Sequence, residues 1–192
     1  MSNRSPHGTD PLEVLHNVGA VLQGHFQYTS GRHGDVYVEK FRLLENPDAT
    51  DRLCGQIADA FREQMVELVV GPTTGGILVA FSTARQLGVE NFFAEKIDNG
   101  PTRSLKRGFS VRPGQRTLIV DDVLTTGGSL LETIEAVKNA GGNPIGVGVI
   151  VDRTAGKTQF NLPFFSCMML DIDTYSANSC RLCDDGIPLI VT

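Results

Sequence analysis

The stretch TLIVDDVLTTGGS, residues 117–129, decides the fold that the sequence predicts. It begins with a strand-forming run at 117–120 that contains no polar alternation. Such a run is typical of a strand buried on both faces of a parallel sheet. Asp121 and Asp122 follow where the strand should end, and a turn of hydroxyl and glycine residues at 125–129 leads into a helical pattern at 129–140.

This arrangement predicts a site for a sugar phosphate. Ligands of open α/β sheets bind beyond the carboxyl ends of the strands. A glycine-rich turn at a helix N-terminus offers free backbone N–H groups to a phosphate. Paired carboxylates such as Asp121 and Asp122 suit vicinal hydroxyls or Mg²⁺. The alternative is an ordinary strand-to-helix turn, but adjacent acids raise the cost of ionising each other, which argues against a purely structural role.

The same order of strand, glycine-rich turn and helix occurs earlier in the chain. A short strand at 66–70 precedes the glycine-rich turn 71–76 and a helix at 77–87. The turn 71–76 is a candidate for a second anion-binding loop, with Thr74 and Gly75 among its binding residues, and the alternative is an ordinary strand-to-helix turn. Further short strands are predicted at 91–94, 145–151 and 164–170. Strands alternating with helices predict an α/β protein with a doubly wound, mostly parallel sheet flanked by helices.

The N-terminal part reads differently. A helix is predicted to begin at Asp10, with Leu12, Leu15, Val18 and Leu22 on one apolar face. A second helix begins at 46–47 and is expected to carry Met65 on its apolar side, and between the two helices the segment 25–44 is predicted as two or three short strands around a tight turn. We therefore expect a small hood, mainly residues 10–45 plus a C-terminal segment.

A polar segment at 97–107 is predicted as a long loop without strands. Leu105 is its one apolar anchor, and Lys96, Arg103, Lys106 and Arg107 are its cations. A basic lid of this kind would stabilise negative charge on a leaving group and exclude water. The alternative is a solvated surface loop.

Composition limits the class of protein. The chain has 192 residues, 41% hydrophobic and 20% charged, with a net charge of −5. These values predict a globular protein whose partners are neither nucleic acid nor membrane. No apolar run approaches about 18 residues and the first ten residues are polar, so a cytoplasmic location is expected. We expect residues 1–9 to be flexible and residues 10–192 to form a single domain.

The four cysteines do not by their spacing predict a complete metal site or a set of disulfides. Cys180 and Cys183 have the spacing of half a zinc site or of a redox motif, but the sequence has no second CxxC pair. We therefore interpret them as ordinary reduced cysteines in a C-terminal hairpin. Cys54 and the segment 167–169 are predicted core residues.

Several segments together resemble the orotate phosphoribosyltransferases, within the type I phosphoribosyltransferases. The signature is the strand with two acids and a Thr-Thr-Gly turn. The hood segment 26–33, the loop segment 105–109, the Val-Asp-Arg at 151–153 and the tail 180–189 are also similar to that family. The resemblance covers about residues 10 to 190.

The resemblance implies a reaction and its site. The family transfers the 5-phosphoribosyl group from 5-phosphoribosyl-1-pyrophosphate to orotate, giving orotidine 5′-phosphate and pyrophosphate in pyrimidine biosynthesis, with Mg²⁺. It implies catalytic roles for Lys96, Lys106, Arg107 and Asp122, and an orotate site at Tyr37, Lys40, Thr125 and Arg153. It also implies a homodimer in which loop 96–107 reaches the neighbouring site. The implied donor-binding residues are Asp121, Asp122, Val123, Leu124, Thr125, Thr126, Gly127, Gly128, Ser129, Thr74 and Gly75, with Asp121 and Asp122 holding the metal directly or through water.

The chain departs from the best-known form of the family at three places. Thr29 and Gly75 stand where many members have lysine, and 94–96 reads Ala-Glu-Lys where Arg-Lys-Glu is usual. Two alternatives stay open: a phosphoribosyltransferase for another base, and a non-catalytic, ligand-sensing regulator on the same fold. For Arg153, the alternative to base recognition is a surface charge pair with Asp152.

Overall fold

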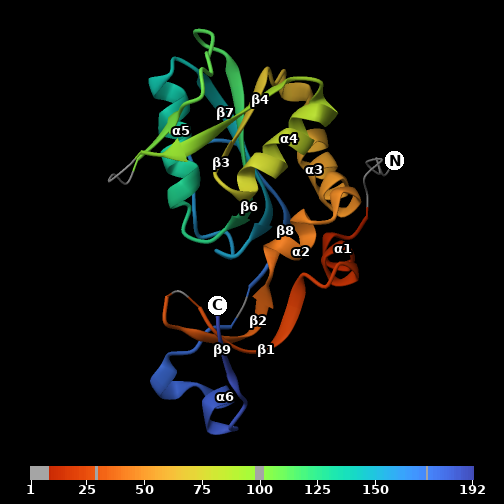
Figure 1. Ribbon diagram of the computed structural model, residues 1–192, viewed down its shortest axis with the longest axis vertical. Coiled ribbons are helices and arrows are strands. Elements are labelled where there is room, and N and C mark those ends of the chain that lie inside the picture. The colour runs from red at the N-terminus through yellow and green to blue at the C-terminus, as the bar shows by residue number, and fades with distance from the viewer. Residues whose placement is uncertain (1–8, 29, 98–101, 172) are drawn as a thin grey trace.

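The computed structural model describes residues 9–28, 30–97, 102–171 and 173–192. The predictions for residues 1–8, for Thr29 and for the centre of the basic loop at 98–101 therefore lie outside the described residues. The described chain contains two sheets: a six-stranded sheet, which with its helices forms the body of the protein, and a three-stranded sheet beneath it (Figure 1).

The six-stranded sheet is mostly parallel, as predicted. Its strand order is β5-β4-β3-β6-β7-β8, and every neighbouring pair is parallel except β4 with β5. The strands are β3 (Leu68–Pro72), β4 (Glu90–Lys96), β5 (Arg103–Leu105), β6 (Arg116–Leu124), β7 (Asn143–Asp152) and β8 (Phe164–Met169). The order of strand connection reverses between the adjacent parallel strands β3 and β6, because β3 leads outward to β4 on one side while β6 leads to β7 on the other. This point is where open α/β sheets bind their ligands.

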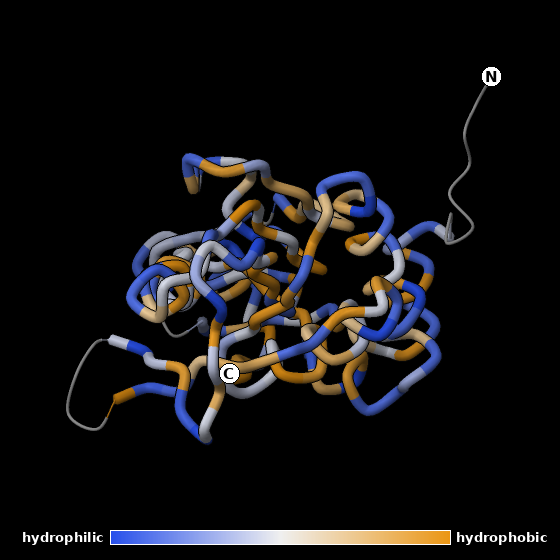
Figure 2. The backbone as a smooth tube through the Cα atoms, turned by 90° about the horizontal axis from the view of Figure 1, so that it is seen from above, coloured by the Kyte–Doolittle hydropathy of each residue, from blue (hydrophilic) through white to orange (hydrophobic). Residues whose placement is uncertain are grey.

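Helices cover both faces of this sheet. Helix α3 (Pro47–Phe61) and α4 (Gly75–Leu87) lie on one face, and α5 (Gly128–Asn139) lies on the other (Figure 1). The sheet residues alternate accordingly: Val69, Leu118 and Val120 belong to the core under α3 and α4, and Leu68 and Ile119 to the core under α5. Figure 2 shows the same pattern as hydrophobic segments in the interior and hydrophilic ones at the rim. Burial on both faces explains the unbroken apolar run in β6.

The predicted N-terminal helix begins where expected but is shorter. Helix α1 (Pro11–Asn17) is capped by Asp10, whose Oδ1 accepts a hydrogen bond of 3.0 Å from the N–H of Leu12. The prediction that Leu22 continues its apolar face was wrong, since Leu22 lies in a strand and is 38% exposed. The period of apolar residues continued across the helix end, so the pattern alone did not mark the boundary.

The hood is a three-stranded sheet that joins the two ends of the described chain. Strand β1 (Val21–Gln27) pairs antiparallel with β2 (His33–Val38) and parallel with β9 (Leu189–Val191). The C-terminal part also contains two short helices, η2 (Ala177–Ser179) and α6 (Arg181–Asp184). Helix α2 (Lys40–Leu44) connects the hood to the body (Figure 1).

Four local predictions need correction. Residues 40–44 form α2 and not a strand, and Phe41 is 54% exposed. Met65 is 72% exposed beyond α3, after the short helix η1 (Arg62–Gln64), and Met169 is 54% exposed at the end of β8. The basic segment is not without strands, because β5 pairs with β4 along the sheet edge. In the described part of the chain, no helix is long and apolar enough to cross a membrane.

Candidate active site

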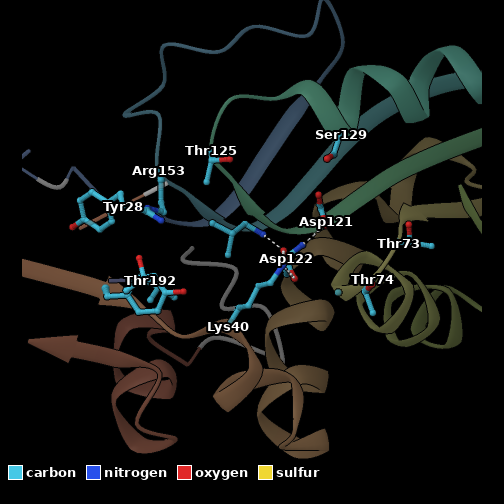
Figure 3. A pocket seen from close by; sticks show the side chains of 14 residues that line it. Tyr28, Lys40, Thr73, Thr74, Asp121, Asp122, Thr125, Ser129, Arg153 and Thr192 are labelled. Carbon is cyan, nitrogen blue, oxygen red and sulfur yellow. Dashed lines mark hydrogen bonds and ion pairs between the residues drawn. The ribbon is translucent and has the colours of Figure 1, made fainter. Parts of the chain in front are cut away.

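The candidate site lies where β3 and β6 end side by side. A cavity of about 380 Å³ opens there between the sheet and the hood. Its lining comes from the hood, from the turn after β3, from the end of β6 with its turn, and from the end of β7: Tyr28, Tyr37, Val38, Lys40, Thr73, Thr74, Gly75, Asp121, Asp122, Val123, Thr125, Ser129, Arg153 and Thr192. Figure 3 shows the two acids in the middle, between Arg153 with Tyr28 on one side and Thr73 with Thr74 on the other.

The two acids lie within strand β6 and not beyond its end. The strand continues to Leu124, so Asp121 and Asp122 are held by the sheet, and they are 9% and 3% exposed. Oδ1 of Asp121 accepts a hydrogen bond of 2.9 Å from the N–H of Asp122. Burial, and then the negative charge of Asp122, raise the pKa of Asp121 to about 7. A carboxyl with this pKa is ready to lose its proton when a cation arrives.

Lys40 supplies the positive charge nearest to Asp122. Its Nζ lies 3.0 Å from Oδ2 of Asp122 and donates a longer hydrogen bond of 3.4 Å to Oδ1. The lysine side chain is 38% exposed, whereas that of Asp122 is 4% exposed. Lys40 therefore extends from the hood to the sheet and holds one acid from the cavity side.

The turn after β6 forms a small hollow beside the main cavity. This hollow has a volume of about 40 Å³ and is lined by Asp121 and by the residues 123–130. Gly127 is the N-cap of α5 with a φ of 83°, a backbone conformation that L side chains rarely adopt. No side chain caps this helix end, so its first N–H groups face the hollow, which is the arrangement that binds phosphate.

The turn after β3 needs glycine because it passes directly over the acids. A Cβ on Gly75 would lie 1.7 Å from Oδ2 of Asp122, and a Cβ on Gly76 would lie 3.0 Å from Oδ1 of Asp121 and 2.6 Å from Cδ of Pro72. A lysine at position 75, as many relatives of the resembled family have, does not fit this backbone. The departure at Gly75 is therefore a packing requirement of this chain.

Arg103 is a buried connector between the two turns. It is 7% exposed, and its Nη1 donates 3.0 Å hydrogen bonds to Oγ1 of Thr73 and to the carbonyl of Ala94. Nη2 donates a bond of 3.4 Å to Oγ of Ser129, and Nε lies 3.2 Å from Oε2 of Glu132 as an ion pair. Sequence reasoning placed Arg103 among the cations of a loop. The structure instead fixes it in β5, where its guanidinium contacts Thr73 of the turn after β3 and Ser129 at the start of α5.

Arg153 projects into the cavity from the end of β7. Its guanidinium carbon lies 5.0 Å from the centre of the Tyr28 ring, which is a cation–π contact. The Tyr28 hydroxyl donates a hydrogen bond of 2.5 Å to the carbonyl of Val36. Asp152 does not pair with Arg153; its Oδ1 accepts hydrogen bonds of 2.7 Å from the N–H and from Oγ1 of Thr154. The alternative of a surface charge pair is thus wrong, and Arg153 lines the cavity.

The predicted lid cations lie elsewhere. Lys96, Lys106 and Arg107 line neither the main cavity nor the small hollow. Arg107 makes two hydrogen bonds to the carboxylate of Glu95, of 2.9 and 2.8 Å, and Nζ of Lys106 donates a bond of 3.4 Å to the carbonyl of Lys96. The structure therefore does not bring them to this chain's own acids.

The other predicted site residues come together. Tyr37, Lys40, Thr74, Gly75, Asp121, Asp122, Val123, Thr125, Ser129 and Arg153 line the main cavity, and Leu124, Thr126, Gly127 and Gly128 line the hollow beside it. Thr73, which belongs to the predicted anion-binding turn 71–76, also lines the cavity. Sequence reasoning assigned no site role to Tyr28, Val38 and Thr192, which line it too. Tyr28 stood inside the quoted hood motif, but nothing in the sequence pointed to Thr192, because its place depends on the pairing of β9 with β1.

The fold and the site define an α/β protein that binds a phosphorylated sugar at the switch point of its sheet. Known proteins agree with this class. The phosphoribosyl transferase domain family matches residues 42–178. The orotate phosphoribosyltransferase of Desulforamulus reducens is 43% identical over 179 residues, which cover 93% of each chain.

Solved structures support the same assignment. The orotate phosphoribosyltransferase of Mycobacterium tuberculosis is 28% identical with a TM-score of 0.69, over 84% of this chain and 97% of that one. That of Aeropyrum pernix is 27% identical with a TM-score of 0.71, over 82% of this chain and 92% of that one. The chain belongs to the orotate phosphoribosyltransferases of the type I phosphoribosyltransferase fold.

Proposed function

We propose that this chain transfers the 5-phosphoribosyl group of 5-phosphoribosyl-1-pyrophosphate to orotate, in the pyrimidine pathway. The observation that carries the proposal is one cavity that joins three parts. They are the buried acid pair of β6, the uncapped N-terminus of α5 and, across the opening, Arg153 against an aromatic ring. Phosphate, ribose and a flat acidic base need these three kinds of contact.

The donor's two phosphate ends fit two helix N-termini. The 5-phosphate would occupy the small hollow at α5, where Thr125, Thr126 and Ser129 add hydroxyl groups to the backbone N–H groups. The pyrophosphate would lie at the turn 73–75, before α4. Arg103 contacts both turns and would keep their spacing constant.

The acids have the donor set that a Mg²⁺ ion needs. Both carboxylates line the cavity, and the raised pKa of Asp121 is the signature of a buried acid whose charge lacks a full counter-ion. Mg²⁺ prefers carboxylate and phosphate oxygens, so Asp121 and Asp122 would hold it with the donor, directly or through water. Bound there, the ion would offset negative charge on the pyrophosphate.

Orotate would lie between the acids and the hood. Arg153 presents a planar fork, which matches a carboxylate in two parallel hydrogen bonds. Tyr37 and Lys40 line the same opening, and Thr125 lies at the edge next to Arg153 (Figure 3). The hood thereby contributes the acceptor contacts, while the sheet contributes the donor contacts.

The reaction exchanges one bond at the anomeric carbon of ribose. The carbon–oxygen bond to pyrophosphate breaks, the deprotonated ring nitrogen of orotate forms the new bond, and the transition state has oxocarbenium character. The buried acid pair would lie beside the ribose and favour the developing positive charge, while the turn at 73–75 would hold the departing anion. Closure of the hood over the cavity would exclude water from the same carbon.

We propose a homodimer in which Lys96, Lys106 and Arg107 act in the neighbouring subunit's cavity. These three cations are not among the residues that line this chain's own cavity, which supports action in trans. Leu78 and Phe81 of α4, 47% and 58% exposed, line an apolar hollow of about 360 Å³ suited to a subunit contact. We also propose that the partners of the chain are its small-molecule substrates and that it is located in the cytoplasm.

A turnover assay tests the function. Purified protein with Mg²⁺ and the phosphoribosyl donor should consume orotate and release pyrophosphate in equal amounts. Asp122→Asn should lose most of this activity because one hard oxygen charge is removed from the metal site. Consumption of uracil or a purine in place of orotate would support the alternative base, and donor binding without pyrophosphate release would support the regulator.

A mixing experiment tests action in trans. Lys106→Ala and Asp122→Asn should each be poorly active alone. If the loop serves the neighbouring site, an exchanged mixture regains activity, because mixed dimers contain one intact site; random exchange gives roughly a quarter of the wild-type activity. No recovery after exchange would place the loop in its own subunit's site.

A further inference from the structure

Four metal-ligating side chains meet in the hood, away from the cavity. His25 of β1, His33 of β2, and Cys180 and Cys183 around the start of α6 place one ligand atom each within 4.8 Å of one another. Three of the four are almost fully buried: His25 is 1% exposed, His33 3% and Cys180 1%. The sequence offered no second CxxC pair for Cys180 and Cys183, and the fold supplies two histidines in its place.

We propose that His25, His33, Cys180 and Cys183 bind one structural Zn²⁺ ion. Two thiolates and two imidazoles are a recurrent ligand set for structural zinc, and their softness disfavours Mg²⁺ or Ca²⁺. The proposal does not depend on the phosphoribosyl transfer, since none of these side chains lines the cavity.

Four of the six distances between the ligand atoms lie near those of a zinc tetrahedron, and all four atoms are within 4.8 Å of one another. With zinc–nitrogen bonds of about 2.0 Å and zinc–sulfur bonds of about 2.3 Å, neighbouring ligand atoms should be about 3.3 to 3.8 Å apart. Nε2 of His25 lies 3.0 Å from Nδ1 of His33, 3.6 Å from Sγ of Cys180 and 3.7 Å from Sγ of Cys183. Nδ1 of His33 lies 3.4 Å from Sγ of Cys183. A cation at the centre would need only small shifts of these side chains.

The surroundings of His25 orient it for a metal. Its Nδ1 lies 2.8 Å from the carbonyl oxygen of Ile187, which can only accept, so the proton is on Nδ1. Nε2 then carries the lone pair and points at the other three ligand atoms. Zinc-binding histidines generally donate their second N–H to a carbonyl or carboxylate in this way.

His33 is held by the C-terminal segment in a different way. Its backbone N–H donates to the carbonyl of Tyr175 at 2.9 Å, and its carbonyl accepts from the N–H of Tyr175 at 2.8 Å. Both histidines are therefore fixed against the same segment that carries the two cysteines. This arrangement orders the four ligands before any ion arrives.

The hood needs such a crosslink because its own core is small. Strand β9 is exposed along its whole length, with Leu189 at 42%, Ile190 at 51% and Val191 at 76% exposure. Small units without a sufficient core generally require a metal or disulfides. An ion at this cluster would join β1, β2 and α6, and would hold the C-terminal segment whose Thr192 reaches the cavity.

A redox-active Cys180–Cys183 pair is the competing interpretation. Both cysteines are free thiols, and a redox pair gives no reason for two buried imidazoles to turn their nitrogens toward the sulfurs. Zinc explains all four side chains together.

Metal analysis of the full chain, purified without a histidine tag, tests the proposal. We expect one zinc per chain by mass spectrometry, and its loss in His25→Ala and in Cys183→Ser. His16→Ala, on the exposed face of α1, and Cys54→Ala, in the core of the body, are matched controls and should keep the zinc. Cys183→Ser is the milder ligand variant, because Cys183 is the most exposed ligand.

A second readout covers variants that fold poorly. Wild-type protein stripped with a chelator and titrated with Co²⁺ should show thiolate-to-cobalt absorption and the visible bands of a tetrahedral site, and Cys183→Ser should lose part of the thiolate absorption. Chelation should also lower the melting temperature. Wild-type protein that contains no zinc and takes up neither ion would overturn the proposal, as would a Cys180–Cys183 disulfide recovered from cells or full zinc content in both ligand variants.

Discussion

Replacing Asp121 with Asn should stabilise the free protein while weakening donor binding. The pKa of Asp121 is raised from 3.8 to about 7, first by burial and then by the charge of Asp122. At about 1.4 kcal/mol per pKa unit, ionising this carboxyl costs the folded state at most about 4 kcal/mol. Burying the Asn side-chain amide also costs free energy, so we expect a gain of about 1 to 2 kcal/mol in the free energy of unfolding at about pH 8. Asn keeps the Oδ1 acceptor for the N–H of Asp122.

The sign of the pH dependence follows from linkage. Below the pKa of the unfolded state the Asp121 carboxyl is protonated in both states, so its ionisation costs the folded state no free energy. As the pH rises toward about 7 the unfolded state loses its proton first, so the wild type loses stability relative to the Asn variant. Above that value the difference is constant.

Urea unfolding of both proteins at several pH values, without metal or donor, measures this effect. Glu90→Gln removes an exposed carboxyl at the start of β4 and serves as the control, with no comparable gain expected. Calorimetric titration with Mg²⁺ and donor should show weaker binding for Asp121→Asn, by about tenfold or more, since a carboxylate ligand is lost. A variant that is less stable at pH 8, or a difference that does not change with pH, would refute this reasoning.

Four more predictions follow from single side chains. Gly75→Ala should lower the free energy of unfolding by about 1 to 3 kcal/mol, because the added Cβ overpacks the site. Gly128→Ala is the control: its Cβ would lie 3.8 Å from Oγ1 of Thr126, so the free energy of unfolding should change little or rise by about 0.5 kcal/mol. Equal urea midpoints for the two variants would contradict this. Arg103→Met should cost about 2 to 4 kcal/mol in urea unfolding, and an unchanged midpoint would show that the connector is dispensable. Arg153→Lys should raise the KM for orotate about tenfold or more with the donor KM unchanged, because the planar fork is lost. Lys106→Ala should lower kcat more than donor affinity, and the reverse pattern would indicate a ground-state role.

The sequence was sufficient for the parallel part of the six-stranded sheet and for one wall of the site. Residues 117–120 are fully buried, and the two acids precede a phosphate-type turn at a helix N-terminus, as the pattern indicated. These features are local: period, turn residues and helix starts act within a few residues. Local signals also located the N-caps at Asp10 and Asn46.

Features that depend on distant segments were missed. The burial of Arg103 depends on the antiparallel pairing of β5 with β4, and its partners are on three other segments. The histidines of the zinc cluster are about 150 residues from the cysteines in the chain, and they meet through the pairing of β9 with β1 and the backbone bridge between His33 and Tyr175. The apolar period of the sequence continues to Leu22 and Met65, beyond the ends of helices α1 and α3, so the pattern predicted longer helices than the structure has.

A crystal structure of the chain with orotidine 5′-phosphate tests the central claim most directly, because this product spans the donor and acceptor parts of the site. The phosphate should lie at the N-terminus of α5 within hydrogen-bonding distance of Thr125–Ser129, and the pyrimidine carboxylate should contact Arg153. A product bound elsewhere, or bound in this cavity with its base away from Arg153 and the hood, would contradict the account.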